Sequence, residues 1–298
     1  MEKKMLFIFN PKAGKGKIKN HLSNIIDIFN KGGYEVIVRA TQGPRDAYEQ
    51  AVKYAAQVDL IVCCGGDGTL DEVVTGMMHV EDDTPIGYLP AGSTNDFANS
   101  LFLPKNLEDA ARNVMEEVPY RCDIGRFNDG TFAYVAAFGL FTEVSYATDQ
   151  DLKNLLGHLA YVIEGIRSLA DIRTYHAKVT SEEVKLEGDF IYCMVSNSRS
   201  VGGFKGITGK DVDMNDGVFE VTLVQAPKNV LELQGIISTL ISGTAHSELV
   251  HIFKSSKVIF ESEVGIPWTL DGEFGGEETY VEIENRKQAL QMYLKSTK

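Results

Sequence analysis

The first third of the chain alternates short apolar runs with segments in which apolar residues recur at helical spacing. The apolar runs predict four strands, over residues 5–9, 34–39, 58–64 and 85–89. The helical spacing predicts four helices, over residues 18–29, 44–56, 69–78 and 107–117. Because strands that alternate with helices form a parallel sheet, this pattern predicts an α/β domain over residues 1–118.

After about Val118 the pattern changes to many runs of strand type separated by short turns. Two strands are predicted around an Asp129-Gly130 turn, and seven more over residues 174–181, 184–188, 189–198, 217–225, 256–263, 279–285 and 288–295. Helices are predicted over residues 153–169 and 228–242. These features predict a β-rich, antiparallel second domain over residues 119–298, whose last strand, near residues 288–298, could return to the first domain.

Composition narrows the class of protein. Lys and Arg total 29 against 42 Asp and Glu, giving a net charge of −13, whereas a nucleic-acid binder needs a basic face. No run of about 18 apolar residues is present, and the amino terminus lacks the apolar core of a signal peptide. The four cysteines form no CxxC pair and are interpreted as reduced core thiols. We therefore expect a cytoplasmic globular protein that binds no nucleic acid.

Three loops of the first domain each follow a predicted strand and lead toward a helix. They span residues 10–17 (NPKAGKGK), 65–69 (GGDGT) and 90–96 (PAGSTND). In an open parallel sheet such loops lie together beyond the carboxyl ends of the strands, where ligands bind. Glycines let backbone N–H groups approach an anion, helix N-termini add unpaired donors, and the three lysines of the first loop add positive charge. Together the loops predict a nucleotide phosphate site.

Each loop also has a purely structural interpretation. Thr69 with Glu72 fits a T-x-x-E capping box, and Ser93 with Asp96 fits a similar helix cap. A complete Walker A pattern is absent, as is a GxGxxG motif with a downstream acid, so a P-loop NTPase and an ordinary dinucleotide site are not expected. Asp67, between two glycines, is the first candidate acid for phosphoryl transfer, in which Mg²⁺ neutralises phosphate charge and an acid accepts the alcohol proton.

Two further acidic segments lie in the second domain, at residues 213–217 (DMNDG) and 270–273 (LDGE), and each also fits an ordinary Asp-Gly turn. Taken together, NPKAGKGK, GGDGTLDEVV, PAGSTNDFA, NDG and LDGE resemble the bacterial diacylglycerol kinase-like lipid kinases, a family that includes sphingosine and ceramide kinases. The resemblance runs from residue 10 to about residue 273. It implies an α/β nucleotide domain of the NAD kinase and diacylglycerol kinase type, followed by a β-sandwich-like domain for the lipid substrate.

The resemblance also implies site residues. ATP contacts are implied at Asn10, Pro11, Lys12, Ala13, Gly14, Thr41, Gly66, Asp67, Gly68, Thr69, Leu70, Asp71, Glu72 and Ser93, the last standing where the family usually has threonine. A structural Mg²⁺ is implied at the NDG turn, held by the carboxylate of Asp216 and by carbonyl oxygens of Asp213 and Val218. In the DGE segment, Asp271 or Glu273 would be the general base, and the other would join Asp67 in an acid–water–Mg²⁺ network.

The leading hypothesis is an ATP- and Mg²⁺-dependent lipid kinase that phosphorylates the hydroxyl of diacylglycerol or a related lipid. One alternative is an NAD kinase-like enzyme with a soluble substrate, which the first loop and the LDGE segment disfavour. Another is a non-catalytic regulator that binds lipid or nucleotide, which the presence of Asp67, Asp216, Asp271 and Glu273 disfavours. The identity of the lipid and the formation of a homodimer stay open.

A lipid substrate requires contact with the membrane surface. Because the net charge is −13 and no spanning segment is expected, we expect a transient, peripheral contact through a limited patch. The candidate is the glycine-rich stretch over residues 201–210 (VGGFKGITGK), which carries Phe204 and Lys205. An ordinary surface loop is the alternative interpretation of this stretch.

Overall fold

The computed structural model describes residues 3–140, 172–201, 204–205, 212–242 and 247–295. The chain forms two compact units. The N-terminal unit comprises Met1–Ile124 and Lys287–Lys298, and the C-terminal unit comprises Gly125–Arg286. Within the described residues, no helix is long and apolar enough to cross a membrane.

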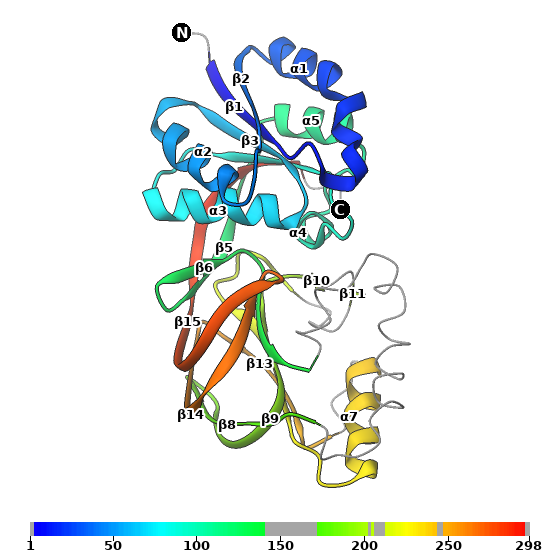
Figure 1. The fold of residues 1–298 in the computed structure, drawn as a ribbon, viewed down its shortest axis with the longest axis vertical. Helices are drawn as coiled ribbons and strands as arrows, with labels where there is room; N and C mark the ends of the chain where they lie inside the picture. The colour runs from blue at the N-terminus through cyan, green and yellow to red at the C-terminus, as the bar shows by residue number, and fades with distance from the viewer. Residues whose placement is uncertain (1–2, 141–171, 202–203, 206–211, 243–246, 296–298) are drawn as a thin grey trace. The chain divides into compact units, whose positions relative to one another are not determined.

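A parallel sheet forms the centre of the N-terminal unit (Figure 1). Its strands are β1 (Lys3–Phe9), β2 (Tyr34–Ala40), β3 (Leu60–Gly65), β4 (Ile86–Pro90) and the end of β15 (Glu273–Tyr293), in the order β15-β4-β3-β1-β2. The helices are α1 (Leu22–Lys31), α2 (Asp46–Tyr54), α3 (Asp67–Val80), α4 (Asp96–Ser100) and α5 (Leu107–Met115), with the 3-10 helices η1 (Ala13–Asn20) and η2 (Ala55–Gln57).

Helices cover both faces of this sheet (Figure 1). α1 and α5 share one buried apolar cluster with Met5, Phe7 and Val62 of the sheet. α2 and α3 lie on the opposite face. They approach each other closely at Gly76 of α3, where an added Cβ would lie 3.1 Å from the Cβ of Ala51 in α2. The parallel α/β architecture predicted from the sequence is confirmed.

Two details of this unit differ from the prediction. The helix expected over residues 18–29 begins at Leu22, because Gly14, Lys15 and Gly16 are left-handed and the chain up to Asn20 forms η1. The short helix α4 has no counterpart in the prediction, since five residues are too few to show a helical period. The four cysteines of the chain are buried and free, as predicted, and burial raises the pKa of each thiol.

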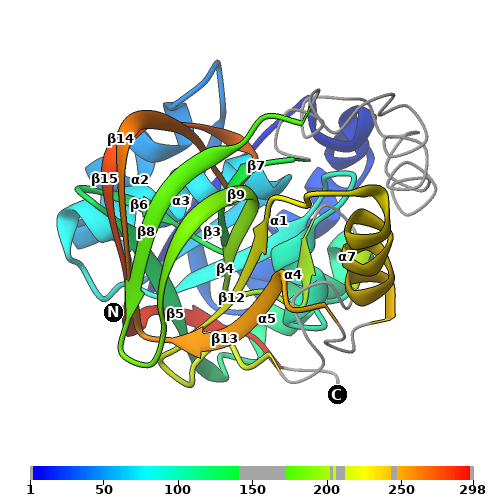
Figure 2. The same cartoon turned by 90° about the horizontal axis from the view of Figure 1, so that it is seen from below.

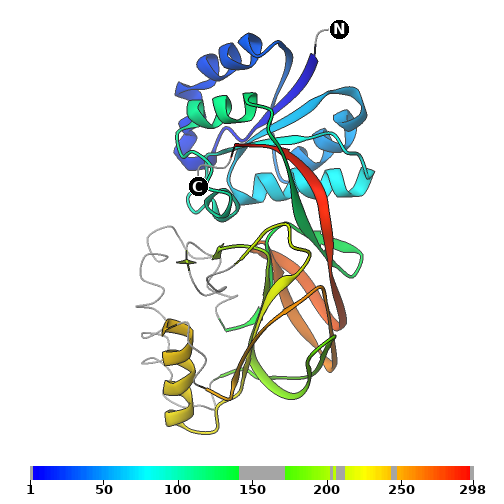
Figure 3. The same cartoon turned by 180° about the vertical axis from the view of Figure 1, so that it is seen from behind.

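The C-terminal unit is mainly antiparallel β-structure (Figures 2 and 3). Its strands are the end of β5 (Pro119–Phe127), β6 (Gly130–Phe132), β7 (Val135–Gly139), β8 (Tyr175–Ser181), β9 (Lys185–Ser196), β10 (Ser200–Val201), β11 (Phe204–Lys205), β12 (Phe219–Gln225), β13 (Val250–Ser255), β14 (Lys257–Leu270) and the first part of β15. One path through the sheet is β13-β12-β9-β7-β14-β15, and β8 pairs with both β9 and β14. Helix α7 (Val230–Ser242) lies to one side of the sheet in both views.

An aromatic cluster fills the core of the C-terminal unit. The Trp268 ring meets the rings of Phe127, Phe138 and Phe260 edge-on, with centroid distances of 4.9–5.2 Å. All four side chains are buried, and such pairs each add about 0.5–1.5 kcal/mol beyond the burial of their area. This packing fixes β7 and β14, the strands from which the LDGE segment and its hydrogen-bond partners extend.

One predicted strand of this unit is interrupted for an identifiable reason. The run after the Asp129-Gly130 turn was expected to be continuous, but it divides into β6 and β7 at Ala133 and Tyr134. The amides of these two residues donate to the Asp271 carboxylate. The strand therefore ends where its backbone amides donate to the side chain of a residue distant in sequence and not to a neighbouring strand.

Elsewhere, runs that were expected as separate strands join into long ones. Residues 184–188 and 189–198 fall largely in β9, and residues 279–285 and 288–295 fall largely in β15. Gly188 forms no turn, because it pairs with Ala177 in the ladder between β9 and β8. β13 has no counterpart in the prediction, and the helix expected over residues 153–169 lies outside the described residues.

Candidate active site

The register of the parallel strands brings their carboxyl ends into line. The aligned residues are Phe9 with Ala40, Phe9 with Cys64, and Gly65 with Pro90. One residue further on, the amides of Asn10, Thr41 and Ala91 each donate to a carbonyl of the neighbouring strand end over 2.8–2.9 Å. The three predicted phosphate loops and Thr41 therefore leave the sheet along a single edge.

The first loop takes its shape from a run of left-handed residues. Gly14, Lys15 and Gly16 have φ values of +54°, +61° and +77°. The Asn10 side chain accepts the amide two residues further on at 2.9 Å, and the three lysines of the loop are exposed. A Cβ on Gly14 would lie 2.1 Å from the carbonyl oxygen of Ala91, so glycine is required there for the first loop to approach the third.

The second and third loops touch backbone to backbone. A Cβ on Gly92 would lie 2.5 Å from the Cα of Gly66. The Asn95 side chain fixes Gly92 by accepting its amide at 2.8 Å and donating to its carbonyl at 2.9 Å.

Gly66 is the N-cap of α3 and has an ordinary extended backbone with φ of −83°. The amides of Asp67 and Gly68, the first two of α3, have no carbonyl of their own helix to bond, so they are donors available to an anion. The Thr69 and Leu70 amides donate to the Gly66 carbonyl at 3.1 and 3.2 Å.

Asp67 occupies the first position of α3. One carboxylate oxygen accepts the Thr94 hydroxyl at 3.1 Å, and the other accepts the Phe97 amide at the long distance of 3.4 Å. Burial raises the pKa of the Asp67 carboxyl to about 6, and the nearby charge of Asp96 adds to this shift, whereas the bonds to Thr94 and the amides oppose it. A carboxylate kept in this costly environment at a helix start is typical of a functional site.

The other expected nucleotide contacts differ in exposure. Gly68 and Ser93 are exposed, and a Cβ on Gly68 would meet nothing within 4 Å. Thr69 is buried and accepts a hydrogen bond from the Asn10 side chain at 3.4 Å, and Leu70 belongs to the apolar core. Pro11, Ala13 and Asp71 are half-buried, as are most other members of the expected set. Leu70 can therefore support the site by packing, whereas the exposed positions can reach a ligand.

The helix caps expected from the sequence are wrong. α3 begins at Asp67 with Gly66 as N-cap, so Thr69 is already inside the helix, and α4 has Asn95 rather than Ser93 as its N-cap. Glu72 does not cap its own helix. Its two carboxylate oxygens accept amides at the start of a different helix, α2.

In the C-terminal unit, the Asp271 carboxylate is engaged with the backbone. It accepts three consecutive amides, those of Ala133, Tyr134 at 3.0 Å and Val135 at 2.9 Å. The Asp271 amide donates back to the Val135 carbonyl at 2.9 Å, and the residue itself is left-handed, with φ of +50°. Asp271 is 6% exposed, so this carboxylate ties the turn after β14 to the start of β7.

Glu273, the second acid of the LDGE segment, has the opposite surroundings. It is exposed, and its carboxylate makes no hydrogen bond or ion pair with any described residue. Gly272, between the two acids, has φ of +91° and would have no atom within 4 Å of an added Cβ. The segment therefore contains one acid, Asp271, whose oxygens bond to the backbone, and one acid, Glu273, whose oxygens make no bond with a described residue.

The NDG turn precedes β12. Asp213 and Asp216 are exposed, and Asp216 accepts the Val218 amide at 3.1 Å. The other Asp216 oxygen pairs with the Lys254 ammonium at 3.3 Å, and Lys254 also pairs with the buried Glu220 at 3.0 Å. Across the described ranges, no three His, Cys, Asp or Glu residues gather as a metal site. The expected set of one carboxylate and two carbonyls needs no such group, and its hard oxygen donors fit Mg²⁺.

Sequence reasoning missed two residues of the third loop, Thr94 and Asn95. Thr94 donates to Asp67, and Asn95, besides holding Gly92, lies 3.4 Å from the hydroxyl of the buried Tyr88. Threonine and asparagine commonly bond the local backbone, which gave a weak signal for Asn95. Local patterns carry no signal for Thr94, because its partner lies 27 residues away.

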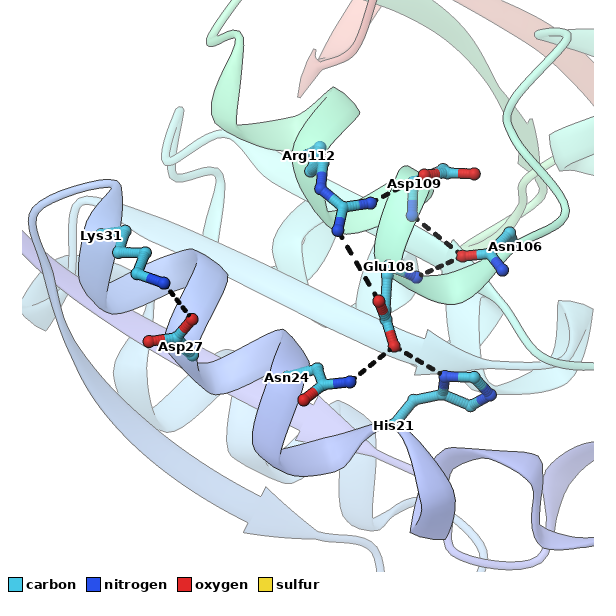
Figure 4. Close-up of polar contacts among 8 residues, drawn as sticks. All are labelled: His21, Asn24, Asp27, Lys31, Asn106, Glu108, Asp109 and Arg112. Carbon is cyan, nitrogen blue, oxygen red and sulfur yellow. Dashed lines mark hydrogen bonds and ion pairs between the residues drawn. The ribbon is translucent and has the colours of Figure 1, made fainter.

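Figure 4 shows how the end of the first loop is held to α5. His21, between η1 and α1, lies 3.1 Å from Glu108 of α5, and Asn24 donates to the same carboxylate oxygen at 2.9 Å. Arg112 lies 3.6 Å from the other oxygen, and the bonds from Asn24 and His21 lower the pKa of Glu108. Asn106 caps α5 by accepting the Glu108 amide at 2.9 Å. These contacts fix the chain just after the first of the three predicted phosphate loops.

Two family models match the chain. The model of the diacylglycerol kinase catalytic domain matches residues 4–127, and the model of the YegS C-terminal NAD kinase beta sandwich-like domain matches residues 135–293. The two matches account for both compact units. They agree with the predicted combination of an α/β domain and a β-rich domain, and the fold class is therefore confirmed.

Curated proteins and solved structures are similar over nearly the whole chain. The diacylglycerol kinase of Bacillus subtilis (strain 168) is 32% identical over 278 residues, covering 92% of this chain and 91% of that protein. The diacylglycerol kinase of Staphylococcus carnosus (strain TM300) is 33% identical over 303 residues, covering 98% and 95%. A crystal structure from Bacillus anthracis strain Sterne, provisionally assigned as a diacylglycerol kinase, is 26% identical with a TM-score of 0.82 and covers 98% of this chain and 95% of that one.

Proposed function

The chain belongs to the diacylglycerol kinase family and is a lipid kinase, and we propose that it transfers the γ-phosphate of ATP to the free hydroxyl of diacylglycerol or a closely related lipid. The product would be phosphatidic acid or the corresponding lipid phosphate. The names of relatives at 32–33% identity support diacylglycerol as the acceptor. We assign ATP binding to residues 1–118 and the lipid to residues 119–298, with the last strand, near residues 288–298, returning to the first domain.

One observation carries the ATP proposal: three loops and Thr41 leave the parallel sheet along one edge, beside the first amides of α3. Donors at a helix start and glycines that permit close approach are suited to phosphate oxygens. The contacts we propose are Asn10–Gly14 of the first loop, Thr41, Gly66–Thr69 and Asp71 at the start of α3, and Ser93, with Leu70 supporting them by packing. The exposed lysines of the first loop add positive charge near this edge.

We propose Glu273 as the general base and Asp271 as the residue that positions it. A base needs an oxygen lone pair free to take the proton of the lipid hydroxyl. Glu273 is exposed and unbonded among the described residues, whereas the Asp271 oxygens accept three amides. As Glu273 accepts the proton, the hydroxyl oxygen would form a bond to the γ-phosphorus and the bond to ADP would break.

Mg²⁺ is the proposed cofactor at the NDG turn. Asp216 would hold it through the carboxylate, and Asp213 and Val218 would do so through carbonyl oxygens. A bound Mg²⁺ neutralises negative charge during phosphoryl transfer. Asp216 is exposed, and Lys254 is its only ion-pair partner among the described residues. This exposure supports access by a hydrated Mg²⁺ ion. Asp67 is the acid we propose for the metal–water network near the phosphates.

A lipid acceptor implies transient contact with the membrane from the cytoplasmic side. Within the proposed contact stretch, residues 201–210, Val201 pairs with Phe204 across β10 and β11, and Lys205 pairs with Ser200, which directly precedes the stretch. Its remaining residues lie outside the described part of the chain. We propose that this stretch meets the lipid surface, with basic residues adding about 1 kcal/mol each near anionic lipid.

The test is a substrate panel with ATP labelled at the γ-phosphate. Diacylglycerol, ceramide and sphingosine are presented in vesicles, NAD is presented in solution, and Mg²⁺ is titrated in each case. We expect label to enter the lipid fraction with diacylglycerol and to depend on Mg²⁺. Labelling of NAD alone would establish the soluble-substrate alternative, and binding of ATP without transfer to any acceptor would establish the regulator.

A further inference from the structure

Glu72 links two parts of the nucleotide site that come from different elements. It lies on α3, whose first residues include Asp67. Its Oε1 accepts the Arg45 amide at 2.8 Å and its Oε2 accepts the Ala47 amide at 3.0 Å, both at the start of α2. A carboxylate is well suited to these donors, because the first amides of a helix have no partner in their own helix and carry partial positive charge.

The packing of α2 on α3 continues from this contact. Gly76 lies one helical turn after Glu72, and a Cβ there would come within 3.0 Å of the Tyr48 carbonyl and 3.1 Å of the Ala51 Cβ. Glu72 and Gly76 therefore share the face of α3 that meets α2. The bidentate bond of Glu72 fixes the position of α2 along this face.

A short chain of hydrogen bonds leads from Glu72 to Thr41. Asp46 lies between the two residues whose amides Glu72 accepts, and its own carboxylate accepts the Gln42 amide at 2.7 Å. Gln42 directly follows Thr41, whose amide is bonded to β1 at 2.9 Å. The loop that carries Thr41 is thus held from β1 on one side and, through Asp46 and Glu72, from α3 on the other.

We propose that Glu72 is a positioning residue, which holds the Thr41 loop beside the phosphate-binding end of α3 without touching the nucleotide. Both of its oxygens are engaged with amides, and a carboxylate aimed at phosphate oxygens would repel them. The inference rests on the proposed ATP site at Thr41. It assigns Glu72 an indirect role in place of the direct nucleotide contact that the family resemblance implies.

The test compares Glu72→Gln with Glu49→Gln, which removes the same charge from an exposed position on α2 that makes no side-chain bond with a described residue. Hydrogen exchange is measured without nucleotide, and KM for ATP and kcat are measured separately. In Glu72→Gln, the new amide group faces a backbone donor, so we expect residues 42–48 to exchange about tenfold faster and KM for ATP to rise about tenfold, with kcat changed less than about twofold. Glu49→Gln should match the parent protein in all three.

Asp46→Ala provides an independent variant that leaves α3 unchanged. It should speed exchange at Gln42 and raise KM for ATP in the same way. Unchanged exchange together with a raised KM in Glu72→Gln would assign Glu72 to the nucleotide itself and overturn the proposal, as would unchanged KM in both variants. If no protein, parent included, uses ATP, the proposed function fails, and the exchange result still reports on the contact.

Discussion

Asp67 and Asp271 are both aspartates followed by glycine, one at the start of α3 and one in the turn after β14, but their surroundings are opposite. Asp271 is 6% exposed and accepts three consecutive backbone amides. Asp67 accepts one hydroxyl and one long amide bond, and burial with the charge of Asp96 raises its pKa to about 6. Backbone amides therefore stabilise the Asp271 carboxylate, whereas ionisation of the Asp67 carboxyl is energetically unfavourable in the folded protein.

This difference distinguishes a carboxylate with a structural role from one that can interact with a ligand. Hydrogen bonds to an ionised group each contribute about 1.5–3 kcal/mol, so the amides around Asp271 make it a strong structural link. Asp67 has weaker compensation, because its bonds to Thr94 and Phe97 do not offset burial, and a carboxylate with a raised pKa is typical of a functional site. The free Glu273 and the engaged Asp271 repeat the contrast within a single segment.

The largest expected effect is on catalysis at Glu273. Glu273→Gln should lower kcat by about 10²–10⁴-fold, because the amide cannot accept the hydroxyl proton. Thermal unfolding should be unchanged, since the side chain is exposed and unbonded among described residues. Glu277→Gln, at another exposed position of β15, is the matched control. A kcat of Glu273→Gln equal to that of this control would remove Glu273 from the mechanism.

The next effect is on stability at Asp271. Asp271→Ala should lower the free energy of unfolding by about 3–5 kcal/mol, because three buried amides lose their acceptor. Denaturant titration measures the loss, and Asp271→Asn, which keeps one carbonyl oxygen, should lose about half as much. A fully stable Asp271→Ala with no turnover would show instead that Asp271 acts in the reaction itself.

Asp67→Asn should do the reverse, raising stability while turnover falls. The pKa of Asp67 is raised from 3.8 to about 6, so its ionisation destabilises the fold as the pH rises through this interval. The shift sets a ceiling of about 3 kcal/mol, and partial exposure reduces the expected gain to about 1 kcal/mol. Melting at pH 8 should show the gain, and melting below about pH 3, where the carboxyl is mostly protonated in both states, should show almost none. A variant less stable than the parent at pH 8 contradicts the prediction.

The smallest expected effects are on stability and on KM for ATP, and they differ between two glycines of the proposed phosphate loops. Gly68→Ala adds a Cβ that meets nothing within 4 Å and should stabilise α3 by up to about 1 kcal/mol, yet raise KM for ATP, because the exposed space is where phosphate is proposed to bind. Gly14→Ala should destabilise the protein, because its φ is +54° and its Cβ would lie 2.1 Å from a carbonyl oxygen. Paired melting curves and ATP titrations check both. An unchanged KM in Gly68→Ala would move the phosphates away from the start of α3.

The sequence predicted the fold class because the spacing of apolar residues, and the glycines and loops that end each element, are local properties of the chain. Strands of the N-terminal unit are apolar at consecutive positions, and a glycine or a loop follows each one. Prediction failed where a distant group changed the local outcome. The run after Asp129-Gly130 divides because Asp271 takes the amides of Ala133 and Tyr134, and residues 184–198 join because Gly188 pairs with Ala177.

The candidate site divides in the same way. The loops, the lysines and the acids were visible as motifs, and the register of the strands brings those loops to one edge. Thr94 was missed, and the cap assigned to Glu72 was wrong, because their partners, Asp67 and the start of α2, are remote in sequence. The choice between Asp271 and Glu273 could not be made from the LDGE segment alone.

The sequence by itself determined which groups are present, and their order along the chain: glycines before helices, acids in turns, and an α/β half followed by a β-rich half. Tertiary structure alone decided what each acid does. An aspartate beside glycine has the same intrinsic chemistry at residues 67 and 271, and its role depends on how many amides reach its oxygens and how much water is excluded. Those quantities are fixed by contacts such as Asp271 with Val135, which lie 136 residues apart in the sequence.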